Sequence, residues 1–350
     1  MFREEMPELP VIAAGSLLDF ASREDGFSMP VGRIMYCYLE PVLFFEFLDV
    51  SGQGELRGAL SRAGETGVLA PRLHQKALEL FSEYCVVGGL PGVVAEWVEH
   101  RDDEQRLQLQ LDLLAAFRDD FNKYRDRVPV ELLRQVMDAV PGQLGGRFVY
   151  SHVDVDARHR EVKQAVELLT LARVCHRVEH TAANGLPLGA ETNPMLFKML
   201  LVDVGIASVQ LDLSRLELRN LAQSVWANKR GLAEQCAGQL LRCLFPTWET
   251  PRLYYWQRTA GRQGEIDYIV QYGSQVIPVE VKAGRAGSMK SLHAFMRAKG
   301  LALAARLDGN PPSVQDVAVK TTTGEDVRYR LLSLPLYMTE ILPLALESAT

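Results

Sequence analysis

Cysteine is scarce and unpatterned in this sequence. The 350 residues include five cysteines, at positions 37, 85, 175, 236 and 243. They form no C-x-x-C pair, and no histidine stands at metal-ligand spacing from them, so the sequence shows neither a disulfide framework nor a zinc motif. An odd number of cysteines without a pattern is typical of reduced thiols in a cytosol. We therefore expect a cytoplasmic protein.

A long uncharged hydrophobic run is also missing. Lys198 and Asp203 interrupt the most apolar long window, "MLFKMLLVDVGIASVQL", so no transmembrane helix is expected. The first residues, "MFREEMPELP", lack the apolar core of a signal peptide. The net charge of −6 argues against a surface that binds polyanions as a whole, although it leaves room for a local basic face.

The sequence contains no Gly-Lys dipeptide, and hence no phosphate loop of the form G-x-x-x-x-G-K-[ST]. In nucleotide-binding proteins this loop provides the backbone N–H groups and the lysine that hold the phosphates. We therefore do not expect this chain to bind ATP.

The pattern of apolar residues predicts an α/β protein with two or three domains. Residues 65–125 read as helices, and 129–183 as a winged helix-turn-helix whose hairpin turns at Asn184-Gly185. Residues 197–208 read as a strand followed by a loop. A helix begins near 229, three strand-like segments follow within 253–281, and "GSMKSLHAFMRAKG" predicts a helix over 287–300. At the other end of the chain, Val11–Ala14 reads as a short buried strand.

Charged residues stand inside two of the predicted strands. In "GEIDYIVQYGSQVIPVEVKAG", Asp267 lies in one strand, and Glu280 and Lys282 lie in the next, although such residues are depleted in strands. Period 2 gives Glu280 and Lys282 the same face, and pairing of the strands would bring Asp267 to that face. Glu234, early in the preceding helix, supplies a third carboxylate. We expect these side chains to converge on one cleft.

Clustered carboxylates bind hard divalent cations through oxygen, so Glu234, Asp267 and Glu280 are the candidate ligands of Mg²⁺ or Mn²⁺. A metal ion held there can activate water and stabilise charge on a phosphoryl group. Lys282 would position the water or neutralise the phosphate. Asp267, Glu280 and Lys282 are thus the candidate catalytic residues.

A simpler interpretation of the same residues stays open. Charge pairs across exposed strands stabilise a sheet by only ~0.2–1 kcal/mol each and need no ligand. Glu234 is also explained as an acid in the first turns of a helix, where it interacts favourably with the helix dipole.

The arrangement resembles the PD-(D/E)XK nuclease fold, in which an acid on one strand and E-x-K on the next form the active site. The wider chain resembles a prokaryotic AAA-type ATPase family with a C-terminal domain of unknown function, DUF4143, which has a nuclease-like core. In order, the matching segments are "VIAAGSLLDF", "PVGRI", "GGLPGVV", "REVKQAVELL", "GLAEQ", "YYWQR" and "EIDYIV…IPVEVKAG".

The resemblance implies four regions. They are a truncated ATPase core at 1–60, a helical linker at 61–128, a winged-helix-like region at 129–205 and a nuclease-like α/β domain at 206–350. The family's phosphate loop would precede Val11–Ala14, and this chain has none, so we expect a shortened family member. Ser16 and Arg33 would be remnants of the nucleotide site, although in a chain without a phosphate loop Arg33 is better explained as a surface residue.

The partner remains open between DNA and another protein. Arg158, Arg160 and Lys163 give a basic start to the second helix of the winged-helix region, which suits phosphate contacts. Acidic residues on and beside the same helix, among them Asp156 and Glu161, dilute that charge. The sequence therefore predicts either a metal-dependent nuclease-like domain or a non-catalytic DNA- or protein-binding module with a vestigial nuclease core.

Overall fold

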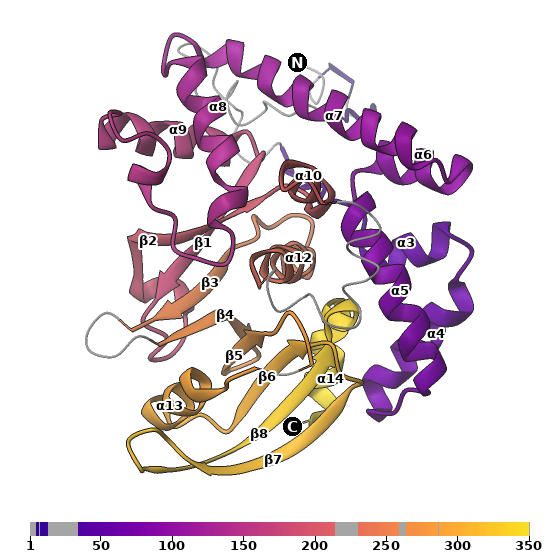
Figure 1. Cartoon of the computed structure of the whole chain (residues 1–350), viewed down its shortest axis with the longest axis vertical. Coiled ribbons are helices and arrows are strands. Elements are labelled where there is room, and N and C mark those ends of the chain that lie inside the picture. The colour runs from indigo at the N-terminus through magenta and orange to yellow at the C-terminus, as the bar shows by residue number, and fades with distance from the viewer. Residues whose placement is uncertain are drawn as a thin grey trace.

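The strands of the structure, a computed structural model, form one sheet of eight strands in the order β2-β1-β3-β4-β5-β6-β8-β7, within the described part of the chain. Residues 5–6, 8–12, 34–213, 230–258, 264–285 and 287–349 are described. The sheet is mixed: β1–β3, β5–β6 and β6–β8 are parallel pairs, and the other neighbours are antiparallel. It curves around helix α12 (Figure 1).

The strands divide between the two halves of the chain. They are β1 (Cys175–Thr181), β2 (Thr192–Leu201), β3 (Leu253–Gln257), β4 (Glu265–Tyr272), β5 (Gln275–Val281), β6 (Leu303–Asp308), β7 (Ser313–Lys320) and β8 (Asp326–Pro335). Because β1 pairs with β3, the sheet crosses the predicted boundary at 205/206.

The described helices fill the first half of the chain and then alternate with the strands. They are α3 (Phe44–Val50), α4 (Gly54–Thr66), α5 (Pro71–Val87), α6 (Pro91–His100), α7 (Asp103–Asp120), α8 (Val130–Ala139), α9 (His159–Leu171), α10 (Val204–Gln210), α12 (Arg230–Arg242), α13 (Lys290–Lys299) and α14 (Leu342–Ala349). The helices predicted within 65–125 and near 229 and 287–300 are therefore confirmed.

Helix α12 is the centre of the main hydrophobic core. Leu232, Ala233, Ala237, Leu240 and Leu241 are all buried in it, on several sides of the helix. A helix that is apolar on most sides is expected inside a protein rather than on its surface. Burial of α12 among α5, α10 and the sheet fixes the position of its buried polar side chains, Glu234, Gln235 and Gln239.

A smaller core lies between the opposite face of the sheet and α13. Ile266, Ile269 and Val276 of β4 and β5 pack there against Leu292 and Phe295 of α13. The two cores give each strand of the β4–β5 pair one face toward α12 and one toward α13. The apolar neighbours of each charged residue on β4 and β5 therefore show whether its side chain lies on the α12 face or on the α13 face.

The predicted strand at Val11–Ala14 is not found where the structure describes it. Val11 and Ile12 have no regular structure and are 58% and 95% exposed, and Ala13 and Ala14 lie outside the described residues. A strand needs neighbours to satisfy its backbone groups, and the sheet does not include these two residues. Ser16 and Arg33, the predicted remnants of a nucleotide site, also lie outside the described residues.

The winged-helix interpretation is not confirmed. Helix α9 ends at Leu171, and the hairpin of β1 and β2 is joined by residues 182–191 instead of a two-residue turn at Asn184-Gly185. The hairpin is also the edge of the large sheet, because β1 pairs with β3 on its other side. It therefore does not project as a free wing.

Residues 204–210 form a helix where a loop was expected. Asp203 ends the extended segment and caps α10, because its Oδ1 accepts hydrogen bonds from the N–H groups of Gly205 (2.9 Å) and Ile206 (3.1 Å). An Asp at this position is among the strongest helix-start signals, and the apolar run around it concealed that signal.

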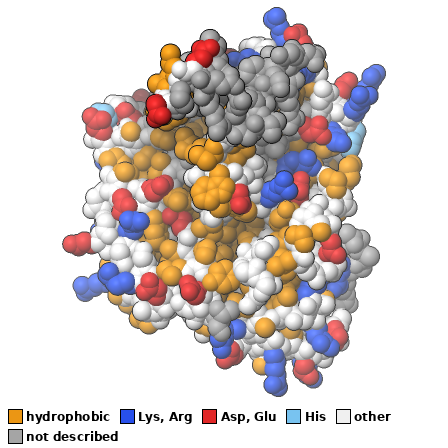
Figure 2. Space-filling model, turned by 180° about the vertical axis from the view of Figure 1, so that it is seen from behind, with side chains coloured by type: hydrophobic (Ala, Val, Ile, Leu, Met, Phe, Trp, Pro, Cys, Tyr) orange, Lys and Arg blue, Asp and Glu red, His pale blue; other side chains and the backbone are white. Residues whose placement is uncertain are grey.

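Figure 2 shows the molecule from behind, relative to Figure 1. On this face, charged side chains of both signs surround a hydrophobic area. The described part of this face shows no concentration of lysine and arginine, which agrees with the charge balance of the sequence. Among the described helices, none has the length and apolar character needed to span a membrane.

Candidate active site

Strands β4 and β5 separate at Asp267. Their antiparallel ladder runs from Tyr272–Gln275 to Tyr268–Val279 and is not continued to the next pair, Asp267 and Glu280. The Asp267 carboxylate takes the place of a backbone acceptor there, because its Oδ2 accepts a hydrogen bond from the N–H of Val281 at 2.8 Å. The side chain is fully buried. The gap between the strands therefore holds a carboxylate in a fixed position.

A β-bulge turns Asp267 toward α12. The β3–β4 register shifts by one residue between the pairs Tyr254–Ile269 and Trp256–Ile266. Ile266 and Ile269 pack on the α13 side, whereas Tyr268 packs in the main core and donates a hydrogen bond to the carbonyl oxygen of Glu234 at 2.6 Å. Bulges of this kind redirect side chains and are frequent beside active sites.

Helix α12 brings Glu234 to the same place. The helix lies close to the sheet at Gly238, where a Cβ atom would be 2.4 Å from the Tyr268 hydroxyl oxygen and 2.5 Å from Leu200 Cδ1. Glycine permits this approach because it has no side chain. Glu234 stands about one turn before Gly238 and is 1% exposed.

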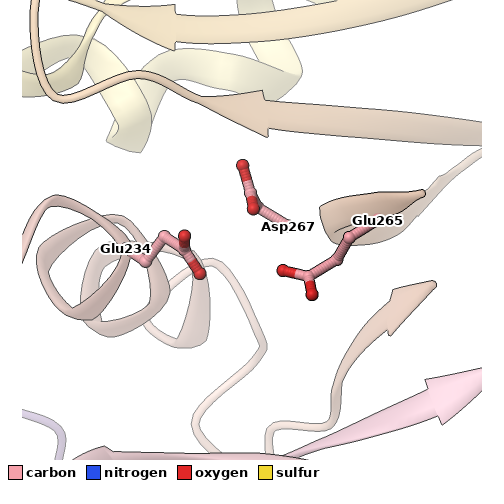
Figure 3. A group of neighbouring side chains, drawn as sticks. All are labelled: Glu234, Glu265 and Asp267. Atoms are coloured by element: carbon pink, nitrogen blue, oxygen red, sulfur yellow. The ribbon is translucent and has the colours of Figure 1, made fainter. Parts of the chain in front are cut away.

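Glu234, Glu265 and Asp267 form a group of three carboxylates with oxygen atoms within 4.8 Å of one another (Figure 3). Glu234 comes from α12, and the other two come from alternate positions on β4. We call these three residues the carboxylate group. Asp267 and Glu234 are buried, whereas the Glu265 side chain is 27% exposed and marks the side open to solvent.

Two cations contact all three carboxylates. Lys198 Nζ, from β2, lies 2.8 Å from Glu234, 2.6 Å from Glu265 and 3.7 Å from Asp267. The side chain of Lys198 is 3% exposed, and its ammonium also lies 5.3 Å from the centre of the Tyr255 ring. Lys198 is thus a built-in counter-charge for the group.

Arg230 contributes the second counter-charge, from the first residue of α12. It lies 2.6 Å from Glu234, 2.7 Å from Asp267 and 3.1 Å from Glu265. Its side chain is 54% exposed, in contrast to the buried Lys198. Of the two cations, Arg230 is therefore the one that can leave the group without opening the core.

Glu280 and Lys282 lie on the other side of this group. Ile277, Val279 and Val281 pack in the main core, so alternation along β5 turns Glu280 to the α13 side. There Lys282 Nζ forms an ion pair with Glu280 Oε1. The expected single cleft is thus divided: the carboxylate group contains Glu265 in place of Glu280, because β5 directs alternate side chains to opposite faces and Asp267 lies between them.

The charge of Asp267 links the two sides. Burial, followed by the negative charge of Asp267, raises the pKa of Glu280 to about 8, and Lys282 and Arg230 only partly oppose this shift. The Oε2 atom of Glu280 is buried and has no hydrogen-bond partner among the described residues. Glu280 is therefore a carboxylate with too little positive charge around it.

The pKa values within the carboxylate group show how the charge is shared. Burial and the neighbouring Asp267 raise the pKa of Glu234 to about 7. Burial alone would raise the pKa of Asp267, yet the charges of Lys198 and Arg230 hold it below its ordinary value. Asp267 is thus the carboxylate that stays ionised.

The whole assembly has more acids than bases. Four carboxylates meet three cations, namely Glu234, Glu265, Asp267 and Glu280 with Lys198, Arg230 and Lys282. Carboxylate oxygens are the ligands that Mg²⁺ and Mn²⁺ prefer. The unpartnered oxygen of Glu280 and the surplus acid fit a divalent cation beside Asp267, and Arg230 is the exposed group that such a cation would displace.

Sequence reasoning missed Lys198, Arg230 and Glu265. Glu265 stands two residues before Asp267, and period 2 along the strand was sufficient to find it. Arg230 stands four residues before Glu234 on the same helix, which is the spacing of an ion pair. Lys198 offered only one signal, a lysine inside an apolar strand.

Two segments of the chain match family models, and both families are domains of unknown function. Residues 78–217 match DUF8612, and residues 230–336 match DUF4143. The predicted C-terminal DUF4143 domain is therefore found, whereas neither match concerns an ATPase or a nuclease. Comparison with curated proteins and with solved structures finds no significant match.

Proposed function

We propose that this chain carries a metal-dependent phosphodiesterase site at the junction of β4, β5 and α12, and that it cleaves nucleic acid. The observation that carries the proposal is the unpartnered, buried oxygen of Glu280 beside the ionised Asp267. Without a ligand, the raised pKa leaves Glu280 mostly protonated at neutral pH. A divalent cation binds the ionised form, so two neighbouring acids of which one lacks a partner suit a cation ligand.

The order of the elements supports the same proposal. Helix α12, the antiparallel strands β3, β4 and β5, helix α13 and the parallel strand β6 follow one another along the chain. This order of elements is the one expected from the resemblance to PD-(D/E)XK nucleases.

Asp267, Glu280 and Glu234 are the residues that would hold Mg²⁺ or Mn²⁺, with Asp267 between Glu280 on the α13 side and Glu234 on the α12 side. When bound, such an ion lowers the pKa of a water molecule and stabilises charge on a phosphoryl group. The hydrogen bond from the N–H of Val281 holds Asp267 in one orientation before any ligand arrives. Such preorganisation limits the reorganisation that ligand binding requires.

Lys282 supplies positive charge on the Glu280 side of the site. Its side chain is 18% exposed and pairs with Glu280. A lysine in this position can donate a hydrogen bond to a phosphate oxygen or to the attacking water. Lys198 has a different role, because it is buried: it keeps Glu234 and Asp267 close together despite their like charges.

A second candidate function is favoured by the ion pairs themselves. Lys198 and Arg230 already contact every member of the carboxylate group. A group so neutralised needs no metal ion for stability. The chain would then be a non-catalytic DNA- or protein-binding module with a vestigial nuclease core.

Cleavage of plasmid DNA and of a single-stranded RNA separates the two candidates. We expect cleavage with Mn²⁺ or Mg²⁺, none with EDTA, and loss of activity in the Asp267→Ala and Lys282→Ala variants. Asp316→Ala is the matched control, because that aspartate is 86% exposed on β7. A folded wild-type chain that cleaves neither substrate, or cleavage that survives Asp267→Ala, would support the binding module.

A further inference from the structure

A cavity of about 760 Å³ lies between the end of β3, helix α13 and the turn that joins β7 to β8. The residues that matter here are Trp256, Arg258, Gly264, Lys290, Ser291 and Arg297. They come from three separate segments of the chain. The cavity is distinct from the carboxylate group, none of whose members lines it.

The cavity is basic in a protein that is acidic as a whole. Three cations line it, Arg258, Lys290 and Arg297, against one acid, Glu325. All four side chains are exposed, and the Arg297–Glu325 pair is loose at 3.7 Å. Pairs of that kind contribute little. Arg258 and Lys290 have no ion-pair partner among the described residues, so their charges remain available to a ligand.

An aromatic ring forms one wall of the cavity. Trp256 is half-buried, and its ring is held by an edge-to-face contact with Phe295 of α13, with ring centres 4.9 Å apart. Gly264 stands beside it: a Cβ atom there would lie 3.8 Å from the Trp256 ring and 4.0 Å from the Ser291 hydroxyl. The ring is thus fixed in place by the core and leaves part of its surface to the cavity.

The cavity adjoins the proposed active site on two sides. Gly264 directly precedes Glu265 of the carboxylate group. Three residues before Lys290, Gly287 packs on the side chain of Lys282, because a Cβ atom at 287 would be 2.5 Å from Lys282 Cδ. Trp256 packs with the smaller core, on the side of the sheet to which Glu280 turns. The cavity is therefore lined by segments that also carry or contact residues of the proposed active site.

We propose that this cavity binds a single-stranded stretch of nucleic acid, with Arg258, Lys290 and Arg297 on the phosphates and Trp256 against a base. Cations that contact phosphates and aromatic rings that stack on bases are the two elements of single-strand recognition. The proposal deepens the proposed function by naming its substrate class. Binding itself needs no metal ion, so it is testable apart from cleavage.

The experiment is the fluorescence anisotropy of a labelled ten-nucleotide oligo-dT in EDTA, for the wild-type chain and the Lys290→Ala/Arg297→Ala double variant. We expect the affinity to fall at least tenfold in the double variant. The slope of log K against log salt should decrease by about 1.4, since each phosphate contact on a single strand contributes about 0.7. Quenching of tryptophan fluorescence by the oligonucleotide should disappear in Trp256→Phe.

The matched control is Lys123→Ala/Arg125→Ala, which removes two exposed cations that follow α7 and lie outside the cavity lining. It should bind as the wild-type chain does. An equal or larger loss in this control, unchanged binding by the double variant, or no binding by the wild-type chain would each overturn the proposal. Displacement of the oligonucleotide by AMP or inorganic phosphate at comparable concentrations would also overturn it, because a small phosphate ligand would then be the occupant.

Because EDTA is present throughout, the result is independent of cleavage. Binding that depends on Lys290 and Arg297 in a chain without nuclease activity would support this cavity and contradict the phosphodiesterase. Metal-dependent cleavage with no effect of the double variant on binding would do the reverse.

Discussion

The ammonium of Lys198 lies 2.8 Å from the carboxylate of Glu234, although the two residues belong to segments that match different families. Lys198 is on β2, at one edge of the sheet, and Glu234 is on α12. The ion pair is buried on both sides. The carboxylate group is therefore completed by a residue from outside the DUF4143 match, and the two segments share one charged centre.

Replacement of Lys198 by methionine should destabilise the protein strongly. The change keeps most of the side-chain volume but leaves Glu234 and Asp267 with Arg230 as their only cation among the described residues. Removal of one partner from a buried pair costs about 3–5 kcal/mol, and we expect a loss in this range in urea unfolding.

The double variant Lys198→Met/Glu234→Gln should recover part of that loss, because it also removes the uncompensated acid. Lys163→Met, at an exposed position on α9, is the control and should change stability by less than about 0.5 kcal/mol. A Lys198→Met variant as stable as this control would show that the buried pair does not hold the site together.

Replacement of Arg230 by glutamine should strengthen the binding of divalent cations. Arg230 contacts Asp267 at 2.7 Å and competes with any other cation for it. An ion pair of a half-exposed side chain contributes up to about 1 kcal/mol, which corresponds to about a fivefold gain in affinity when it no longer has to be broken. Titration with Mn²⁺ by calorimetry measures the change. Weaker binding in the variant would mean that Arg230 supports the site instead of competing for it.

Gly238→Ala should destabilise the protein by disturbing the packing of α12 on the sheet. The added methyl group would lie 2.4 Å from the Tyr268 hydroxyl oxygen and 2.5 Å from Leu200 Cδ1, which is well below van der Waals contact distance. Overpacking of this kind typically costs 1–3 kcal/mol. Gly142→Ala is the control, because no atom lies within 4 Å of the position of its added Cβ. Equal unfolding free energies for the two variants would contradict the close packing of α12 on the sheet.

Glu340 should make stability depend on pH. Burial raises its pKa from 4.5 to about 8, and its carboxylate accepts a hydrogen bond from the N–H of Phe45 at 3.0 Å. The folded state therefore binds the proton more tightly than the unfolded state. Its contribution to stability is present below pH 4.5 and is lost as the pH rises toward 8.

Glu340→Gln keeps the hydrogen-bond acceptor and removes the titration. We expect the Tm of the wild-type chain to fall between pH 5 and pH 8.5 by about 3–5 °C more than that of the variant. Glu65→Gln, at an exposed position, should follow the wild-type curve. Parallel curves for the wild-type chain and Glu340→Gln would show that Glu340 does not titrate in this range.

The sequence predicted the local part of the site. The charges at 267, 280 and 282 stand out against strand propensity, and the helix of Glu234 has a clear apolar pattern. These features depend on neighbours within a few residues, so a single sequence reveals them. Period 2 also predicts that Glu280 and Val281 lie on opposite faces of β5. It does not say which face packs on α12 and which on α13, because that depends on the two hydrophobic cores.

The long-range part of the site was beyond the sequence. Lys198 reaches the carboxylate group because the sheet curves around α12, so that β2 faces β4 although β1 and β3 lie between them. Curvature of a sheet results from the packing of all its strands and leaves no local pattern. The bulge that redirects Asp267 has no glycine or proline to announce it, since "EIDYI" reads as a regular strand.

The binding of Mn²⁺ to the wild-type chain and to Asp267→Asn tests the central claim most directly. Electron paramagnetic resonance of free Mn²⁺ at pH 8, with Asp316→Asn as the control, counts the bound ions. We expect one ion for each wild-type and each Asp316→Asn chain, and a loss of that site in Asp267→Asn while the far-UV spectrum is unchanged. No bound ion in the wild-type chain, or the same binding in Asp267→Asn, would contradict a metal site at Asp267.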